Sequence, residues 1–446
     1  MCIQMIYILL PSVNISVYDH IHCTSNPELP VPIISHSHSH YLYDIKNKIK
    51  SYGRDWDEYR QYTNPYEYIN TMMPNNSKCV SKYKPLSRSY FKMLELIQFF
   101  DLLHPEDITG AFSSFKTLGK SFVSEKRCIN SFHLAEGPGG FIEALANLRK
   151  DPEDTYVGMT IMDSANDSNI PAWKKSEHFL RCNPNVFLEN GSTGTGDILS
   201  VENFAYCVEK YGSKMDLITA DGGFDFSSNF NNQEIDIGKL LFGQICYALC
   251  LQKKHGHFVL KIFDCFMAHT IDLLYMLSAF YEKVYITKPN TSRYANSEKY
   301  IVCKNFLFSS NDIFLPKLKK CLEITVRNVN PIHRFLTCSI SNYYLNKIEE
   351  YNAIFGQQHI ENIQQTIILI ENKHKHDKIE NYIKSNTTKC VNWCVNHNVP
   401  HNIYCTGVTH NNVRTEDADM GALSSFKTRP RMGVLNEERC NAFIHP

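Results

Sequence analysis

The sequence has no excess of either charge and no long hydrophobic run. Lys plus Arg and Asp plus Glu each number 46, so the formal net charge is zero and any nucleic-acid site must be a local basic groove. No apolar stretch reaches the roughly 18 residues that a membrane helix needs. The apolar start, residues 1–10, lacks the basic region and small-residue cleavage site of a signal peptide. We therefore expect neither a membrane span nor a secretory signal.

Cysteine is not scarce, but its 16 residues form no compact framework. They are scattered over 446 residues, and a chain of that length needs no disulfides to hold its core. We therefore expect reduced thiols and an intracellular protein. Hydrophobic residues at 43% and charged residues at 21% are ordinary for a globular chain, which excludes a wholly disordered one.

Sequence patterns divide the chain into three regions. Residues 1–80 form an N-terminal extension, residues 81–309 the central domain, and residues 310–446 a mainly helical region with a polar tail. In the extension, Ser and His alternate over residues 35–40; the tract could bind a metal, but no acidic or Cys residues flank it, so we interpret it as a solvated loop. Apolar residues at helical spacing over residues 45–59 predict an amphipathic helix.

In the central domain, short β-branched runs alternate with helical stretches. Buried strands are predicted at residues 131–134, 156–161, 217–220 and 258–262, and helices at residues 141–149, 172–180, 201–211 and 237–254. This alternation predicts βαβ units and an α/β fold with a doubly wound, mainly parallel sheet. Two closing strands, residues 283–287 and 299–306, are separated by a polar loop and fit an antiparallel hairpin at one sheet edge.

Near the C-terminal end, residues 390–397 predict a helix with a possible alternative role. Its Cys and His residues and one further His have the C-x3-C-x2-H-x3-H spacing of some zinc sites: Cys390, Cys394, His397 and His401. The apolar residues between them fit a buried helix face, and free Cys is often buried as a small apolar group. We favour the buried helix and expect no metal.

The most informative segment is a glycine-dense turn between the first strand and the next helix. It consists of Glu136, Gly137, Pro138, Gly139, Gly140 and Phe141. Glycine lets the backbone take positive φ and approach a ligand, and nucleotides bind at the carboxyl end of the first strand of such sheets. The spacing is not that of a dinucleotide fingerprint, and proline has no N–H for a pyrophosphate. A nucleoside with a cationic substituent, such as S-adenosylmethionine, fits better, with Glu136 meeting an ammonium or a hydroxyl.

A second candidate cofactor contact lies further along the chain. Asp197 and Ile198 end a glycine-rich loop directly before a predicted helix. The carboxylate could accept a hydrogen bond from an adenine amino group while Ile198 packs on the ring. Asp197 could equally be the N-cap of that helix.

Four polar residues occur at the ends of predicted elements. Asp221 follows an apolar strand and precedes two glycines, where active-site groups collect in this architecture. Lys261 interrupts an apolar strand, and a lysine there needs a partner because burial disfavours its charged form; Asp221 on the neighbouring strand is the natural one. Glu298 stands at the mouth of a later strand, and Lys92 on a helix before the first strand.

Together with residues 89–92 and 297–300, these segments resemble the FtsJ-type ribose 2′-O-methyltransferases, and most closely the cap-specific mRNA enzymes of eukaryotes and large DNA viruses. The resemblance covers residues 81–308. It implies a Rossmann-like sheet that binds S-adenosylmethionine through residues 136–141, Asp197, Ile198 and Asp221. It also implies a Lys-Asp-Lys-Glu catalytic tetrad of Lys92, Asp221, Lys261 and Glu298, with Lys261 as the base.

The resemblance favours capped mRNA as substrate, methylated on its first transcribed nucleotide. Ribosomal or transfer RNA, and a non-catalytic RNA-binding or scaffold role, stay open as alternatives. RNA would approach over locally basic surface, for which the candidates are Lys82, Lys84 and Arg88, just ahead of Lys92 in the sequence, and Lys253 and Lys254, ahead of the Lys261 strand. Other capping or transcription proteins are expected partners. A viral enzyme would work in the cytoplasm, and a cellular relative could be nuclear.

Overall fold

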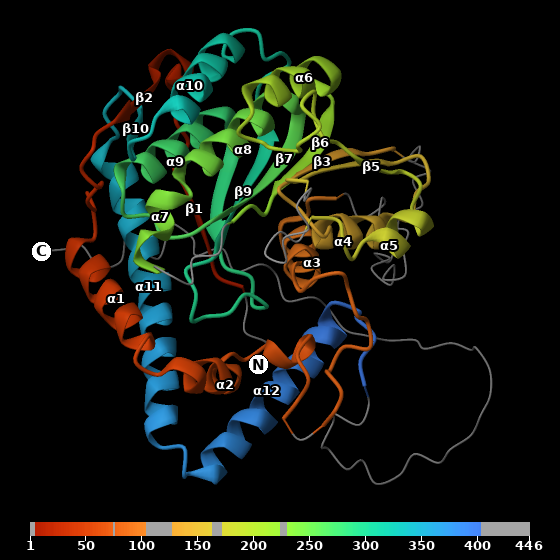
Figure 1. Cartoon of the computed structure of the whole chain (residues 1–446), viewed down its shortest axis with the longest axis vertical. Coiled ribbons are helices and arrows are strands. Elements are labelled where there is room, and N and C mark those ends of the chain that lie inside the picture. The colour runs from red at the N-terminus through yellow and green to blue at the C-terminus, as the bar shows by residue number, and fades with distance from the viewer. Residues whose placement is uncertain (1–4, 75, 104–126, 163–171, 224–229, 403–446) are drawn as a thin grey trace, which may run out of the picture. The chain divides into compact units, whose positions relative to one another are not determined.

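The computed structural model describes residues 5–74, 76–103, 127–162, 172–223 and 230–402 (Figure 1). Within them, eight strands form one sheet in the order β1-β8-β9-β7-β6-β3-β4-β5. Its parallel part consists of β3 Asn130–Leu134, β4 Thr155–Met159, β5 Val186–Leu188, β6 Met215–Ala220 and β7 Gln252–Ile262. The predicted α/β fold with a mainly parallel sheet is confirmed.

Antiparallel strands complete the sheet beyond β7. β9, Lys299–Phe306, pairs with β7 and with β8, Tyr281–Thr287, so the predicted hairpin is present. β1, Tyr7–Leu9, pairs with β8 and takes the outermost position. The hairpin is therefore one strand in from the edge, and the start of the chain belongs to the sheet. A strand of three residues is too short to show an alternating pattern.

Alternate side chains of the strands face two different hydrophobic cores. Phe132 and Leu134 belong to one core, and Leu217 and Val259 belong to the other. The first core includes α6 Val201–Tyr211, α8 Gly238–Leu251 and α9 Ala268–Phe280, and the second includes α3 Ser89–Phe100 and α4 Gly140–Arg149. Helices thus cover both faces of the sheet, as the predicted alternation requires.

Some predicted boundaries are wrong. The helix predicted at residues 237–254 is α8 and ends at Leu251, because β7 begins at Gln252. A short helix, α7 Gln233–Asp236, precedes α8. The helix predicted at residues 172–180 is α5, Glu177–Cys182. β5 is missing from the prediction because it has only three residues, two of them exposed. Asp163, the first acidic residue after β4, lies outside the described residues.

The two extensions pack on each other. α1 His36–Ile49 and α2 Gly53–Thr63 lie against α11 Asn342–Glu371 in a cluster that includes Leu42, Trp56 and Ile363. β2 Ile21–Ser25 pairs with β10 Ile332–Leu336. The remaining elements are η1 Val17–His20, η2 Glu67–Ile69, η4 Phe230–Asn232, α10 Leu315–Arg327 and α12 His376–Asn396.

Two expectations for the N-terminal extension are wrong. The Ser/His tract is not a loop, because α1 begins at His36, and His38 packs against Gly356 and Phe266. Tertiary packing thus orders a segment whose composition predicts solvation. The single amphipathic helix is two helices: α1 ends at Ile49, and α2 begins at Gly53, whose left-handed φ of 49° breaks the continuity between them. None of the helices in the described part of the chain is long and apolar enough to cross a membrane.

Candidate active site

The glycine turn joins β3 to α4 and places Glu136 in the interior. This carboxylate is 3% exposed and accepts a 2.6 Å hydrogen bond from the Phe141 N–H through Oε1, while Oε2 has no partner among the described residues. Burial raises the pKa of Glu136 well above its usual value, and the negative charge of Asp221 adds to the effect. Two neighbouring acids, one with a free buried oxygen, form a site that favours a cationic or hydrogen-bond-donating ligand group.

The glycines of this turn are required by the packing of the chain itself. A Cβ at Gly137 would lie 2.4 Å from the carbonyl oxygen of Ala172, and one at Gly140 would lie 2.2 Å from Ser89 Oγ. Gly139 has a φ of 101°, which disfavours other residues. The interpretation that these glycines serve the approach of a ligand is therefore incomplete, because they also let α3 pack against the turn.

Asp197 and Ile198 lie beside the carboxyl end of β4. The loop that carries them packs so closely there that a Cβ at Gly196 would touch the Thr160 carbonyl oxygen. Ser200 is the N-cap residue of α6, so the interpretation of Asp197 as that cap is wrong. Ile198 is buried and Asp197 is half-buried. Both residues thus lie near the carboxyl ends of the parallel strands, where the glycine turn also lies.

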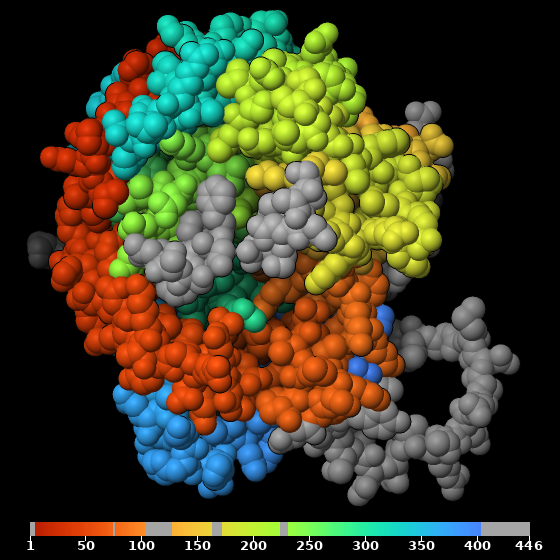
Figure 2. Space-filling model, viewed as in Figure 1, coloured from red at the N-terminus to blue at the C-terminus, as the bar shows by residue number. Residues whose placement is uncertain are grey.

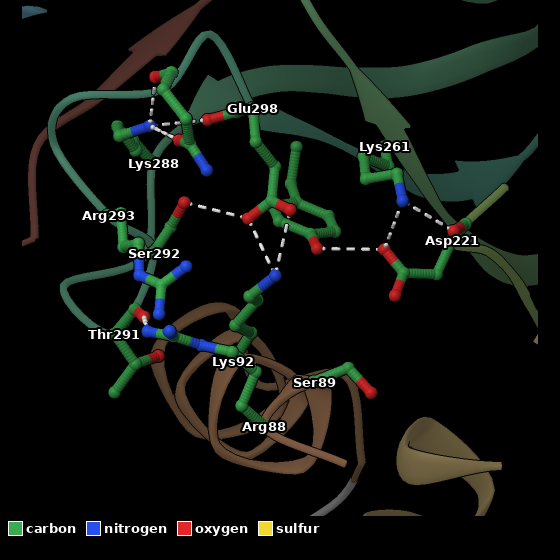
Figure 3. A network of polar contacts seen from close by, with 12 residues as sticks. Arg88, Ser89, Lys92, Asp221, Lys261, Lys288, Thr291, Ser292, Arg293 and Glu298 are labelled. Atoms are coloured by element: carbon green, nitrogen blue, oxygen red, sulfur yellow. Dashed lines mark hydrogen bonds and ion pairs between the residues drawn. The ribbon is translucent and has the colours of Figure 1, made fainter. Parts of the chain in front are cut away.

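Asp221 and Lys261 form the ion pair that the sequence predicts. Asp221 directly follows β6, and Lys261 is near the end of the neighbouring strand β7. Lys261 Nζ lies 3.3 Å from Asp221 Oδ1 and donates a 2.6 Å hydrogen bond to the Asp221 carbonyl oxygen (Figure 3). A Cβ at Gly223 would lie 3.2 Å from Nζ, so glycine leaves room for the amine.

Lys92 and Glu298 form a second ion pair. Lys92 projects from α3, and its Nζ lies 2.7 and 2.8 Å from the two carboxylate oxygens of Glu298. Ser292 Oγ donates a 2.7 Å hydrogen bond to the same carboxylate. Burial acts to raise the pKa of Glu298, but Lys92, Lys261 and Lys288 together hold it below its usual range. Glu298 is therefore an ionised, fixed acceptor.

Tyr300 connects the two pairs, a role that the sequence analysis missed. Its hydroxyl donates to Asp221 Oδ1 at 2.9 Å, and Lys92 Nζ lies 5.9 Å from its ring centroid. Burial raises the pKa of Tyr300, and Asp221 adds to the rise, so the hydroxyl stays a donor. The period of two along a strand places Tyr300 on the same side of β9 as Glu298, and this pattern could have identified it.

Glu298 is held by buried groups on both sides. Lys288 Nζ donates to the Glu298 carbonyl oxygen at 2.7 Å. Asp264 binds the two residues that flank Glu298, accepting from Ser297 Oγ at 3.0 Å and pairing with Lys299 Nζ at 3.1 Å.

Asp264 also ties this segment to the N-terminal extension. Nζ of Lys46, on α1, lies 2.7 Å from Oδ2 of Asp264, and both side chains are almost fully buried. Burial acts to raise the pKa of Asp264, but Lys46 and Lys299 hold it well below its usual range. The N-terminal extension thus contributes to the support of the site, which its sequence gives no sign of.

The four residues with zinc-like spacing, Cys390, Cys394, His397 and His401, form no group that could hold a metal ion among the described residues. Cys390 and Cys394 are buried on α12, as the buried-helix interpretation predicts, and burial raises the pKa of the Cys390 thiol. His397 contacts Gln98 through Nδ1 and packs against the Trp393 ring in a tilted arrangement. This segment is part of the core.

Comparisons with known proteins identify the central domain. Residues 85–306 match the family described as FtsJ-like methyltransferase. Cap-specific mRNA (nucleoside-2'-O-)-methyltransferase 2 of Drosophila melanogaster is 27% identical over 286 residues, covering 61% of this chain and 37% of that protein. The Mus musculus protein of the same name is 26% identical over 363 residues, covering 77% and 44%. Cap-specific mRNA (nucleoside-2'-O-)-methyltransferase 1 of Homo sapiens is 31% identical over 274 residues, covering 58% and 30%. The chain spans less than half the length of these relatives.

Proposed function

The chain contains an FtsJ-like methyltransferase domain over residues 85–306, and from this premise we propose that the protein transfers a methyl group from S-adenosylmethionine to a ribose 2′-hydroxyl of RNA. The proposed substrate is the first transcribed nucleotide of capped mRNA. The observation that carries the proposal is the convergence of the ion pairs Lys92–Glu298 and Lys261–Asp221, linked by Tyr300, beside the buried Glu136.

The residues present fit S-adenosylmethionine, which when bound supplies a methyl group on a positively charged sulfur. Glu136 has a buried oxygen without a partner among the described residues, and its pKa is raised by burial and by Asp221, so a nearby cation would restore its charge. Asp197 and Ile198 lie beside the carboxyl end of β4 and are the residues expected to contact the adenine. These residues would hold the cofactor.

The chemical task of the protein is to position the 2′-hydroxyl and accept its proton. A hydroxyl is a weak nucleophile, so orientation and general-base catalysis both contribute. Lys261 Nζ, in its neutral amine form, is the proposed proton acceptor: it takes the proton of the 2′-hydroxyl, and Asp221 holds the amine in place and pairs with the ammonium that forms. Lys92, held by Glu298, would donate a hydrogen bond to the ribose oxygen and so fix the position of that oxygen.

Capped mRNA is the proposed substrate because three relatives carry cap-specific names and cover up to 77% of this chain. An N7-methylated guanine carries a positive charge, and aromatic faces bind such rings. We infer that the protein distinguishes this cap from its unmethylated form. Proteins of capping or transcription are proposed partners on the same ground.

The test is a radiolabelled methyl-transfer assay with the full chain. Four RNAs are compared. Three share one oligonucleotide sequence and carry an N7-methylated cap, an unmethylated cap or no cap, and the fourth is a structured RNA. Transfer to the first transcribed nucleotide of the N7-methylated RNA is expected, with weaker binding of the unmethylated cap. Lys261→Ala should abolish transfer and retain cofactor binding measured by calorimetry. Preferred methylation of structured RNA would overturn the substrate, and undiminished transfer by Lys261→Ala would overturn the mechanism.

A further inference from the structure

Two arginines beside the Lys92–Glu298 pair share one buried carboxylate. Arg293 donates to both oxygens of Glu67, through Nη2 at 2.6 Å and Nε at 2.9 Å, and Arg88 Nη1 lies 3.3 Å from Oε1. The Glu67 side chain is 3% exposed, whereas each arginine side chain is 30% exposed. Because arginine stays protonated in proteins, this group of three carries one excess positive charge that solvent reaches.

Both arginines are attached to the site through short segments. Arg88 precedes Lys92 by four residues, and α3 begins directly after it, so the two side chains lie on neighbouring turns of one face. Arg293 directly follows Ser292, whose hydroxyl is bonded to Glu298. A displacement of either arginine would therefore shift Lys92 or Glu298.

The arginines also lie on a defined side of the site. Figure 3 shows both guanidinium groups on the opposite side of Lys92 from Asp221. The Lys92–Glu298 and Lys261–Asp221 pairs are each neutral when ionised, so they do not offset the excess positive charge of the arginine group. A methyl donor at Asp221 and a ribose at Lys92 would leave the next backbone group of the RNA facing the arginines.

We propose that Arg88 and Arg293 bind the RNA backbone phosphate adjacent to the ribose that is methylated, an inference that rests on the proposed function. A phosphodiester carries the single negative charge that balances the excess. Guanidinium groups bind phosphate oxygens through paired hydrogen bonds, which fix orientation as well as charge. Glu67 fixes both guanidinium groups before RNA binds, so the arginine side chains lose less conformational entropy on binding. The phosphate contact thereby determines which ribose lies beside Lys261.

The first experiment uses the unaltered protein. Its affinity is measured for capped oligonucleotides in which one phosphodiester at a time, on either side of the first transcribed nucleotide, is replaced by a neutral methylphosphonate. One position next to the reacting ribose should lose roughly tenfold or more in affinity, as expected for a hydrogen bond to a charged group. Equal affinity for all the substituted RNAs would overturn the proposal.

The second experiment asks whether Arg293 is responsible. Arg293→Gln should weaken binding of the unmodified RNA, lower the slope of log affinity against log salt by about 0.7 for one lost contact to a single strand, and remove the extra penalty of the methylphosphonate. The matched control is Arg334→Gln, because Arg334, on β10, is 37% exposed and makes two hydrogen bonds to the buried Asp272 of α9. That control should bind RNA as the unaltered protein does.

The outcomes separate this proposal from the proposed function. Methyl transfer by the unaltered protein, combined with the same methylphosphonate penalty in Arg293→Gln, would overturn the phosphate contact alone. RNA binding with an Arg293-dependent penalty but without any transfer would support the contact and overturn the enzymatic proposal. A loss of affinity in both arginine variants would indicate general charge and also count against the contact.

Discussion

The hydroxyl of Tyr300 donates a 2.9 Å hydrogen bond to Oδ1 of Asp221, the same oxygen that lies 3.3 Å from Lys261 Nζ. This contact fixes one carboxylate between an amine and a phenol. The Tyr300 ring also lies below Lys92. A single side chain on β9 therefore orients groups from both ion pairs, and the geometry of the proposed base depends on it.

Tyr300→Phe should lower the rate of methyl transfer by roughly tenfold, because it removes one hydrogen bond to a charged group while the ring stays in place beneath Lys92. Rates under saturating RNA and cofactor measure this. Tyr281→Phe is the matched control, since the buried Tyr281 hydroxyl donates a 3.0 Å bond to Gln252 away from the site. Full activity of Tyr300→Phe would show that Asp221 needs no such orientation.

Glu136→Gln should weaken binding of S-adenosylmethionine by roughly tenfold, since the free carboxylate oxygen no longer offers a charge to the cation. Burial raises the pKa of Glu136 well above its usual value, so the ligand-free protein holds a proton there as pH falls, and a cation must displace it. Affinity should therefore rise with pH, and binding should release protons.

Calorimetry in two buffers of different ionisation enthalpy measures that release. The control is Glu143→Gln, another buried acid of raised pKa that accepts from Tyr83 and from the Leu86 N–H. Proton release that persists unchanged in Glu136→Gln would place the titrating group elsewhere.

The sequence predicts the sheet well because its strands are buried on both faces and bounded by turn residues. It also predicts the Asp221–Lys261 pair, because a lysine in an apolar strand needs a partner. It does not reveal Tyr300, Lys46 or Asp264, whose significance comes only from neighbours distant in the chain. Lys46 looks like one more charge on an amphipathic helix, and only tertiary structure shows it buried against Asp264. Packing likewise turns the Ser/His tract into the first turns of α1.

Lys46→Met should destabilise the protein by about 3 kcal/mol, because a fully buried Asp264 would keep only Lys299 as an ionic partner. Asp264 also holds Ser297 beside Glu298, so turnover should fall in the folded variant more than RNA affinity does. Urea unfolding and steady-state kinetics measure the two effects. Lys347→Met, which breaks a more exposed pair with Glu350 on α11, should cost less than about 1 kcal/mol. Equal stability losses in both variants would contradict the role of Lys46.

The Glu67 cluster should make stability depend on pH in the acid range. Burial acts to raise the pKa of Glu67, but the hydrogen bonds and charges of Arg293 and Arg88 hold it at about 2. Because the pKa is lower in the folded state than the usual value near 4.5, the ionised group stabilises the fold above about pH 4.5, and this contribution is lost as pH falls toward 2. The difference corresponds to on the order of 3 kcal/mol.

Glu67→Gln removes the titrating group, so its stability should lie on the order of 3 kcal/mol below that of the unaltered protein at pH 6 and approach it as the pH falls below about 4.5. Urea unfolding at successive pH values gives this difference directly. Glu350→Gln, at an exposed carboxylate, should show a small difference at every pH. A Glu67→Gln difference that stays constant from pH 6 to pH 3.5 would mean that folding does not lower the pKa of Glu67. The two arginines would then not stabilise the Glu67 carboxylate, and the preorganised phosphate site proposed for them would lose its support.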